Sequence, residues 1–127
     1  MATARPLTKL HALDPEFHLL HEQAQQLYKS SNETQLEQAF QYAHSAYQLQ
    51  PEFIANLNLL ARIELKRLNF SAAEAWCEIG LNKNPKSISL LYSRGHIALA
   101  QNQINQAEHY FTQVLSISRV ATKALNY

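Results

Sequence analysis

Apolar residues along most of this chain follow the spacing of amphipathic helices, with one face recurring at intervals of three and four positions. Short polar turns and prolines separate the apolar stretches. Two glycines and four prolines in 127 residues leave little room for long loops. The pattern predicts an all-α fold of six helices, over about 15–29, 34–50, 52–68, 71–82, 87–100 and 105–117.

Polar residues mark the starts of several predicted helices. Asp14 followed by Pro15 is a favourable N-cap and first helical residue. The segments Thr34–Glu37 and Ser71–Glu74 fit the capping box, in which a hydroxyl and a carboxylate satisfy free backbone amides of the first turn. We therefore expect the second and fourth helices to begin at these two segments.

Key positions recur at a constant interval of 34 residues. Ala39, Ala73 and Ala107 keep this interval, and further sets do the same: Leu36, Phe70 and Ile104; Pro51 and Pro85; Leu57 and Leu91; Ala61 and Gly95. A fixed period of this length indicates stacked helix–turn–helix units. The period predicts three repeats, over about 15–51, 54–87 and 88–119, in one domain over 14–119 that follows a lead-in of residues 1–13.

Small and large residues at these positions explain why the units would stack. Small side chains such as Ala73 and Gly95 let helices approach closely, and large ones such as Leu91 fill the space between layers. Cys77 holds a position that is normally buried, so we expect it to be a small core residue. Arg94 interrupts an apolar position. We expect its stem to cover the core with its head in solvent, or the repeat to be distorted there.

The repeats resemble the tetratricopeptide family. The second repeat fits that pattern with Leu57, Leu60, Ala61, Phe70, Ala73, Gly80 and Pro85, and the third with Leu91, Gly95, Ile104, Ala107, Phe111 and Val114. The third departs from the pattern at Arg94 and at Arg119, where proline is expected. The resemblance implies a right-handed α-solenoid whose first helices line a concave groove.

The groove positions implied by this resemblance give a set of candidate binding residues: Asn58, Arg62, Lys66, Tyr92 and His96. A mixture of amide, cations and aromatic groups suits a peptide or a helix of a partner protein. Co-chaperones of the tetratricopeptide family bind the C-terminal carboxylate of a partner with a clamp of Lys and Asn residues. Here the matching positions hold Glu22, Gln26, Leu59, Ser89 and Ser93, so we expect no such clamp.

The last residues allow two interpretations. If the period continues, residues 120–127 begin a partial seventh helix, which would belong to a capping helix or a fourth repeat of a longer protein. Alternatively, they extend the sixth helix. An uncapped C-terminal end would also offer a surface for a homodimer.

Composition narrows the classes of function. A formal charge of +1 favours neither nucleic acid nor an anionic membrane surface as a partner. No apolar run is long enough to span a bilayer, and we expect no secretory signal because the first residues lack an apolar core. Cys77 is the single cysteine, which fits a reducing compartment. We expect a cytoplasmic protein.

Candidate chemical groups give weak signals. His18, His21 and Glu22 lie close together, but their order differs from the zinc-hydrolase motif, and we expect them to be solvated. The cations Arg62, Lys66 and Arg67 are expected to form an ordinary solvated helix face. We therefore expect no metal, no cofactor and no catalysis, and a non-enzymatic interaction module. The alternative is the N-terminal regulatory or substrate-presenting domain of a longer enzyme.

Overall fold

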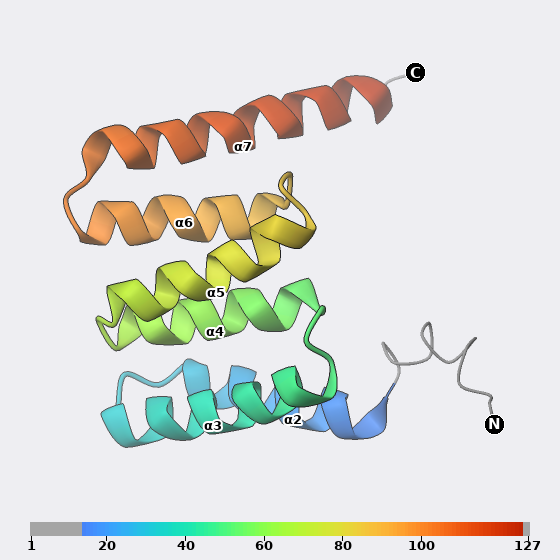
Figure 1. The fold of residues 1–127 in the computed structure, drawn as a ribbon, viewed down its shortest axis with the longest axis vertical. Coiled ribbons are helices and arrows are strands. Elements are labelled where there is room, and N and C mark those ends of the chain that lie inside the picture. The colour runs from blue at the N-terminus through green and yellow to red at the C-terminus, as the bar shows by residue number, and fades with distance from the viewer. Residues whose placement is uncertain (1–13, 126–127) are drawn as a thin grey trace.

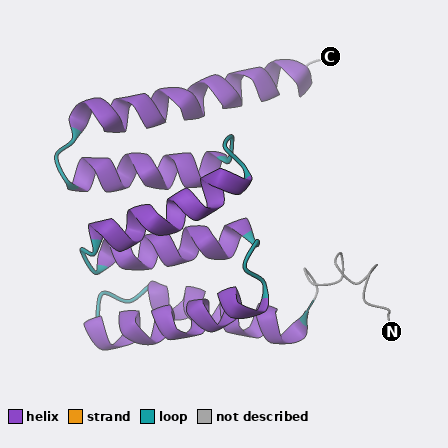
Figure 2. Ribbon diagram, viewed as in Figure 1, coloured by secondary structure: helices purple, strands orange, loops and turns teal. Residues whose placement is uncertain are grey.

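The computed structural model describes the backbone of residues 14–125 and the side chains of residues 14–120, so the predicted lead-in lies outside it. All regular elements in this part of the chain are helices (Figure 2), as the sequence predicts. They are α2 (Pro15–Tyr28), α3 (Glu33–Leu49), α4 (Ile54–Lys66), α5 (Phe70–Lys83), α6 (Ile88–Ala100) and α7 (Ile104–Leu125). None of these helices has the length and apolar character needed to cross a membrane.

The helices follow one another along the long axis of the molecule (Figure 1). Each packs against the next in sequence, as expected for a helical repeat. The first helices of the three units, α2, α4 and α6, also contact one another in series. The backbones of α3, α5 and α7 are not in contact with one another within the described residues. The first helices therefore lie closer together than the second helices do.

The 34-residue period appears directly in the helix positions. Helices α4 and α6 have equal lengths and start 34 residues apart, as do Phe70 and Ile104, the first residues of α5 and α7. The first unit differs, because α3 begins at Glu33, three residues before Leu36, its counterpart of Phe70. The first unit therefore carries almost one additional helical turn at this point.

The turns after α4 and α6 have the same left-handed geometry. Leu68 and Asn102 have φ angles of 64° and 62°. The amide of Asn69 donates to the carbonyl of Glu64 at 2.8 Å, and that of Gln103 donates to the equivalent Ala98 at 2.9 Å. These bonds satisfy the last carbonyls of each helix and reverse the chain within three residues.

Two predicted helix starts are wrong, one because of the turn at Leu68 and the other because of the cap at Asn32. Helix α5 begins at Phe70, directly after the left-handed turn, so the Ser71–Glu74 segment lies inside the helix. Helix α3 is capped by Asn32, whose side chain accepts from the amide of Gln35, so the Thr34–Glu37 segment is also internal. The prediction at Asp14 is confirmed, since its side chain accepts from the amide of Glu16.

Two buried clusters form the core, one between α2, α3 and α4 and one between α4, α5 and α6. Three alanines of α2 and α3 in the first cluster pack against Leu59, Leu60 and Ile63 of α4 and allow close helix packing. The second joins Ala61, Ala73 and Cys77 to Leu90 and Ile97 of α6. Cys77 is fully buried, as predicted, and burial raises the pKa of its thiol to about 12. The thiol therefore stays protonated and unreactive in the folded protein.

Of the two interpretations of the last residues, the structure supports the second: up to Leu125 they extend the sixth predicted helix and do not begin a seventh. Helix α7 runs without a break to Leu125, and in Figure 1 it extends well past α6. Pro51 and Pro85 follow the ends of α3 and α5, but Arg119 stands at the equivalent place in α7. Arginine keeps its amide donor and its helical freedom, so nothing ends the helix there.

One of the two predicted arrangements of Arg94 placed its guanidinium in solvent. The structure contradicts that arrangement. The Arg94 side chain is only 12% exposed and pairs with Glu74 at 3.5 Å and Glu78 at 3.3 Å. The guanidinium also lies 5.0 Å from the centroid of the Tyr110 ring. A residue of α6 at an apolar position therefore fixes α5 and α7 by charge and ring contact.

Candidate functional site

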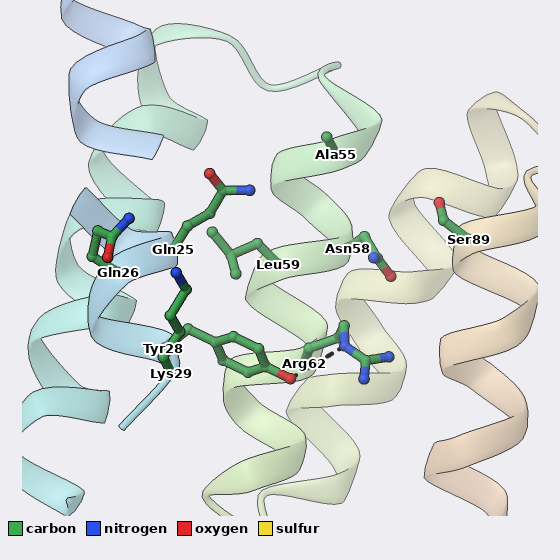
Figure 3. Close-up of a pocket in the computed structure, with 9 residues that line it drawn as sticks. All are labelled: Gln25, Gln26, Tyr28, Lys29, Ala55, Asn58, Leu59, Arg62 and Ser89. Carbon is green, nitrogen blue, oxygen red and sulfur yellow. Dashed lines mark hydrogen bonds between the residues drawn. The ribbon is translucent and has the colours of Figure 1, made fainter. Parts of the chain in front are cut away.

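A depression of about 570 Å³ lies between α2, α4 and the start of α6. Figure 3 shows that its side chains come from three successive units of the stack. The lining residues are Gln25, Gln26, Tyr28, Lys29, Ala55, Asn58, Leu59, Arg62 and Ser89. The depression therefore lies on the side where the first helices approach one another.

Arg62 is the centre of a polar network across this depression. Its Nε donates to the hydroxyl of Tyr28 at 3.2 Å, the dashed line in Figure 3, and its Nη1 donates to Oγ of Ser93 at 3.3 Å. Ser93 in turn donates to Oδ1 of Asn58 at 2.5 Å. The network links α2, α4 and α6, and it brings two predicted groove residues, Asn58 and Arg62, to one site.

Arg62 carries a charge that no described carboxylate neutralises in an ion pair. Its side chain is half-buried, and no carboxylate among the described residues forms an ion pair with it. The lining includes a second cation, Lys29, and no acidic residue. Neutral hydroxyls compensate a guanidinium less than a carboxylate would. The depression is therefore electrostatically suited to an acidic group.

Other lining groups supply hydrogen bonds and an apolar base. Gln25, Gln26 and Asn58 contribute amides, each able to donate and to accept. Leu59 is buried and Ala55 is exposed at the margin. Amides around an apolar base are the groups that a polypeptide backbone pairs with.

Lys66 does not line the depression. Its ammonium donates to the carbonyl oxygens of Tyr28 at 2.6 Å and Ser30 at 3.4 Å, and it lies 4.2 Å from the Tyr28 ring centroid. A cation at the C-terminal end of α2 satisfies free carbonyls and interacts favourably with the helix dipole. Lys66 thereby fastens the first unit to the second.

Tyr92 and His96 form a separate aromatic cluster on α6. Their ring centroids are 4.6 Å apart, and both rings contact Phe111 of α7, at 5.7 Å and 5.5 Å. Partial burial lowers the pKa of His96, and the positive charge of Arg62 lowers it further. The imidazole is therefore mainly neutral at pH 7, which favours ring packing.

The basic cluster on α4 is only in part the solvated face predicted from the sequence, because Lys66 is exposed but Arg62 and Arg67 are partly buried. Arg67 is largely buried and pairs with Glu37 at 2.6 Å, Glu33 at 3.2 Å and Glu64 at 3.5 Å. Lys66 and Arg62 bond the carbonyl and hydroxyl groups described above. The three cations therefore hold the first two units together.

His21 is buried, which contradicts the prediction that it is solvated. Its ring lies parallel to that of Phe17, and its Nδ1 is 2.8 Å from Oδ1 of Asn56. Since Asn56 Nδ2 donates to the carbonyl of Ala43, Nδ1 of His21 is the donor in the other bond. Among the described residues, no three His, Cys, Asp or Glu side chains converge as metal ligands.

The sequence predicted that Asn58 and Arg62 share one surface, which the structure shows, but it did not indicate their contacts with Tyr28 and Ser93. Both contribute through contacts between helices more than 30 positions apart in the chain, which the period of a single helix cannot reveal.

A scan against models of protein families gives no match, and a search of curated proteins finds no relative of this chain. The resemblance to the tetratricopeptide pattern therefore stays a prediction that depends on the spaced residues alone.

Proposed function

We propose that this chain is a non-enzymatic binding module that holds a segment of a partner protein in the depression between α2, α4 and α6. The observation that carries the proposal is Arg62, a half-buried cation in the lining of that depression that forms no ion pair with a described carboxylate. An acidic side chain of the ligand would supply the missing charge. A volume of about 570 Å³ suits a few residues of a polypeptide.

Each group in the depression has a defined part in this binding. The carboxylate of the ligand pairs with Arg62 in two parallel hydrogen bonds, and Lys29 strengthens the attraction from the margin. Gln25, Gln26 and Asn58 bond the backbone of the ligand. Leu59 contacts an apolar side chain next to the acidic one. The ligand is therefore a peptide or helix in which an acidic residue adjoins an apolar residue.

We also propose the finer architecture, a right-handed solenoid of the tetratricopeptide kind. The 34-residue period and the serial contacts of α2, α4 and α6 support it. In such an arrangement Tyr92 and His96 continue the groove along α6, where they would contact an aromatic or apolar part of the ligand. Lys66 would contribute through the position of Tyr28.

The groups present favour an internal acidic residue over a terminal carboxylate. Ser93 is buried in the Arg62 network, Leu59 is apolar and Gln26 is neutral, so the positions of a carboxylate clamp hold no cation. A peptide with an amidated C-terminus should therefore bind as well as one with a free carboxylate.

The proposal can be tested with peptides selected from a random display library on the wild-type protein. We expect the selected sequences to contain an acidic residue, and Arg62→Gln to weaken their binding by about tenfold, the scale of one buried charge-assisted contact. Lys83→Gln is the matched control, because Lys83 is an exposed cation at the end of α5 that does not line the depression. Its affinity should match that of the wild type in isothermal titration.

A second variant separates loss of binding from loss of folding. Ala55→Trp fills the depression from an exposed position and leaves the Arg62 network intact, so it should abolish binding while the thermal melt stays near that of the wild type. Selected peptides without acidic residues, or equal affinity for wild type and Arg62→Gln, would refute the proposal.

A further inference from the structure

A second hollow, of about 500 Å³, lies between α6 and α7 at the opposite end of the stack. Large apolar side chains are exposed around it, with Leu99 at 44%, Ile104 at 55% and Leu115 at 60%. The complete lining is Leu99, Ile104, Ala107, Glu108, Phe111, Thr112 and Leu115. This surface is separate from the depression around Arg62, and nothing inferred below depends on the proposed function.

Each lining residue lies 34 positions after a residue of the second unit. The counterparts, in the same order, are Leu65, Phe70, Ala73, Glu74, Cys77, Glu78 and Leu81. In the second unit this surface is covered by α6. Ala73 and Cys77 are buried in one cluster with Leu90 and Ile97 of α6, and Leu65 and Leu81 pack against that cluster. The hollow between α6 and α7 thus continues an interface that the molecule already uses internally.

An acidic residue of the internal interface also recurs at the hollow, 34 positions later in the chain. Glu74 pairs with Arg94 of α6 at 3.5 Å, so the internal interface joins an acid of one unit to a cation of the next. Glu108 is the counterpart of Glu74 and is exposed at the hollow. No described side chain forms an ion pair with Glu108. The surface therefore combines an apolar base with an acid that forms no ion pair with a described side chain.

We propose that the hollow between α6 and α7 binds an amphipathic helix of a different protein, which lies there as α6 lies on α4 and α5. The docked helix carries a cation opposite Glu108, at the place of Arg94. Three residues later, at the place of Ile97, it carries an apolar side chain. These two groups reproduce the contacts that α6 makes with the second unit.

The hollow between α6 and α7 differs at one position from the internal surface that α6 covers. Gly80 leaves room for Leu90, because a Cβ atom at Gly80 would overlap a methyl group of that leucine. The counterpart of Gly80 in the third unit is Val114. The docked helix therefore needs a side chain smaller than leucine at the place of Leu90, such as alanine.

A second copy of this chain is a poorer occupant. Leu19 of α2 is exposed at the other end of the stack, but Gln23 and Gln26 stand four and seven positions later, where a cation and an apolar group are needed. On α3, Tyr42 and Leu49 are exposed and seven positions apart, but the residue four after Tyr42 is the buried Ala46. Neither helix offers the required pattern, which favours a partner of another kind.

The probe for this site is a fluorescein-labelled peptide of residues 87–101 that carries Leu90→Ala. We expect saturable binding to the full chain in fluorescence anisotropy. Leu115→Asp in the protein should weaken it by about tenfold or more, since a charge then stands on the apolar base. Leu19→Asp is the matched control, because Leu19 is similarly exposed, at 56%, on the opposite end. It should leave the affinity unchanged.

An exchange of charges between peptide and protein tests whether the cation of the docked helix lies opposite Glu108. Arg94→Glu in the peptide should weaken binding, and Glu108→Arg in the protein should restore it for that peptide alone. The peptide that keeps Leu90 should bind more weakly than the one with alanine, because of Val114. Arg62→Gln in the protein should change none of these affinities.

Three results would overturn the inference. They are the absence of saturable peptide binding, equal binding by wild type and Leu115→Asp, and no restoration by the charge exchange. Sedimentation velocity adds a fourth: a dimer that Leu115→Asp dissociates would make a second copy the occupant of this surface, as the uncapped end predicted from the sequence suggests.

Discussion

The second and third units have the same helix register but different chemistry on the side of the first helices. Asn58 and Arg62 of α4 correspond to Tyr92 and His96 of α6, 34 positions later. The former pair belongs to a hydrogen-bond network with Ser93, whereas the latter packs its rings against Phe111. Equivalent places on one scaffold thus offer a cation in one unit and an aromatic surface in the next.

This difference in surface chemistry is caused by a pair of core positions beneath the surface. In the second unit Ala61 and Cys77 lie in one buried cluster, and in the third their counterparts are Gly95 and Phe111. The Phe111 ring lies so close to Gly95 that a Cβ there would be 2.5 Å from its Cε1 atom. Removing one methyl group makes room for a ring, and that ring then supports Tyr92 and His96. The comparison teaches that a compensated exchange in the core can change the character of a surface.

The largest loss of stability should come from placing a phenylalanine in the second unit at the position that corresponds to Phe111. Cys77→Phe forces a ring into a filled cluster beside Ala61 and Leu90, and we expect a loss of about 3 kcal/mol in the free energy of unfolding, the upper part of the usual range for overpacking. Urea unfolding followed by circular dichroism measures it. Adding Ala61→Gly should recover part of the loss, and a neutral Cys77→Phe would show that the two pairs are not equivalent.

A smaller effect is expected from the opposite change in the third unit. Gly95→Ala brings a methyl group against the Phe111 ring, which costs about 1–3 kcal/mol, while the better helix propensity of alanine returns up to about 1 kcal/mol. The net destabilisation should be about 1–2 kcal/mol in the same unfolding experiment. In Gly95→Ala/Phe111→Cys, which copies the pair of the second unit, the methyl group should cost nothing further. Additive losses in this double-mutant cycle would contradict the exchange.

The smallest effect concerns the influence of the positive charge of Arg62, in the second unit, on the pKa of His96, in the third. The pKa of His96 is lowered mainly by burial and in part by Arg62, so at a pH just below 6.5 the unfolded chain binds a proton that the native chain does not. Stability should therefore fall as the pH drops from 7 through 6.5 towards the lowered pKa. An NMR titration of His96 should show a higher pKa in Arg62→Gln than in the wild type. An unchanged value would mean that burial alone sets it.

The sequence predicted those features that depend on one helix or on the period. Helices α4 and α6, the buried alanines and the burial of Cys77 all follow from spacing. The turn after α4 was predicted at residues 69 and 70, too late in the chain, because no glycine marks the left-handed residue Leu68. The burial of Arg94 depends on two acids on another helix, which periodicity cannot identify.

The candidate site was predictable only in part, for the same reason. Arg62 and Asn58 are four positions apart on one helix, so their shared face follows from the sequence. Their neighbours Tyr28 and Ser93 come from two other helices, whose distances depend on how the units pack. The bond between His21 and Asn56 likewise joins residues 35 positions apart.

The contacts of Lys66, Arg67 and His21 across the boundary between the first two units have a consequence for the order in which the molecule opens. That boundary is fastened by the ion pairs of Arg67 with Glu33 and Glu37, by two carbonyl bonds of Lys66 and by the buried bond of His21 to Asn56. Helix α7, by contrast, leaves Leu115 and Val120 exposed within the described part of the chain, and its last turns extend past α6 (Figure 1). Because the stability of a repeat stack is a sum of neighbouring contributions, partial unfolding should proceed from α7 inwards, with α2 to α4 as the last cooperative unit to open.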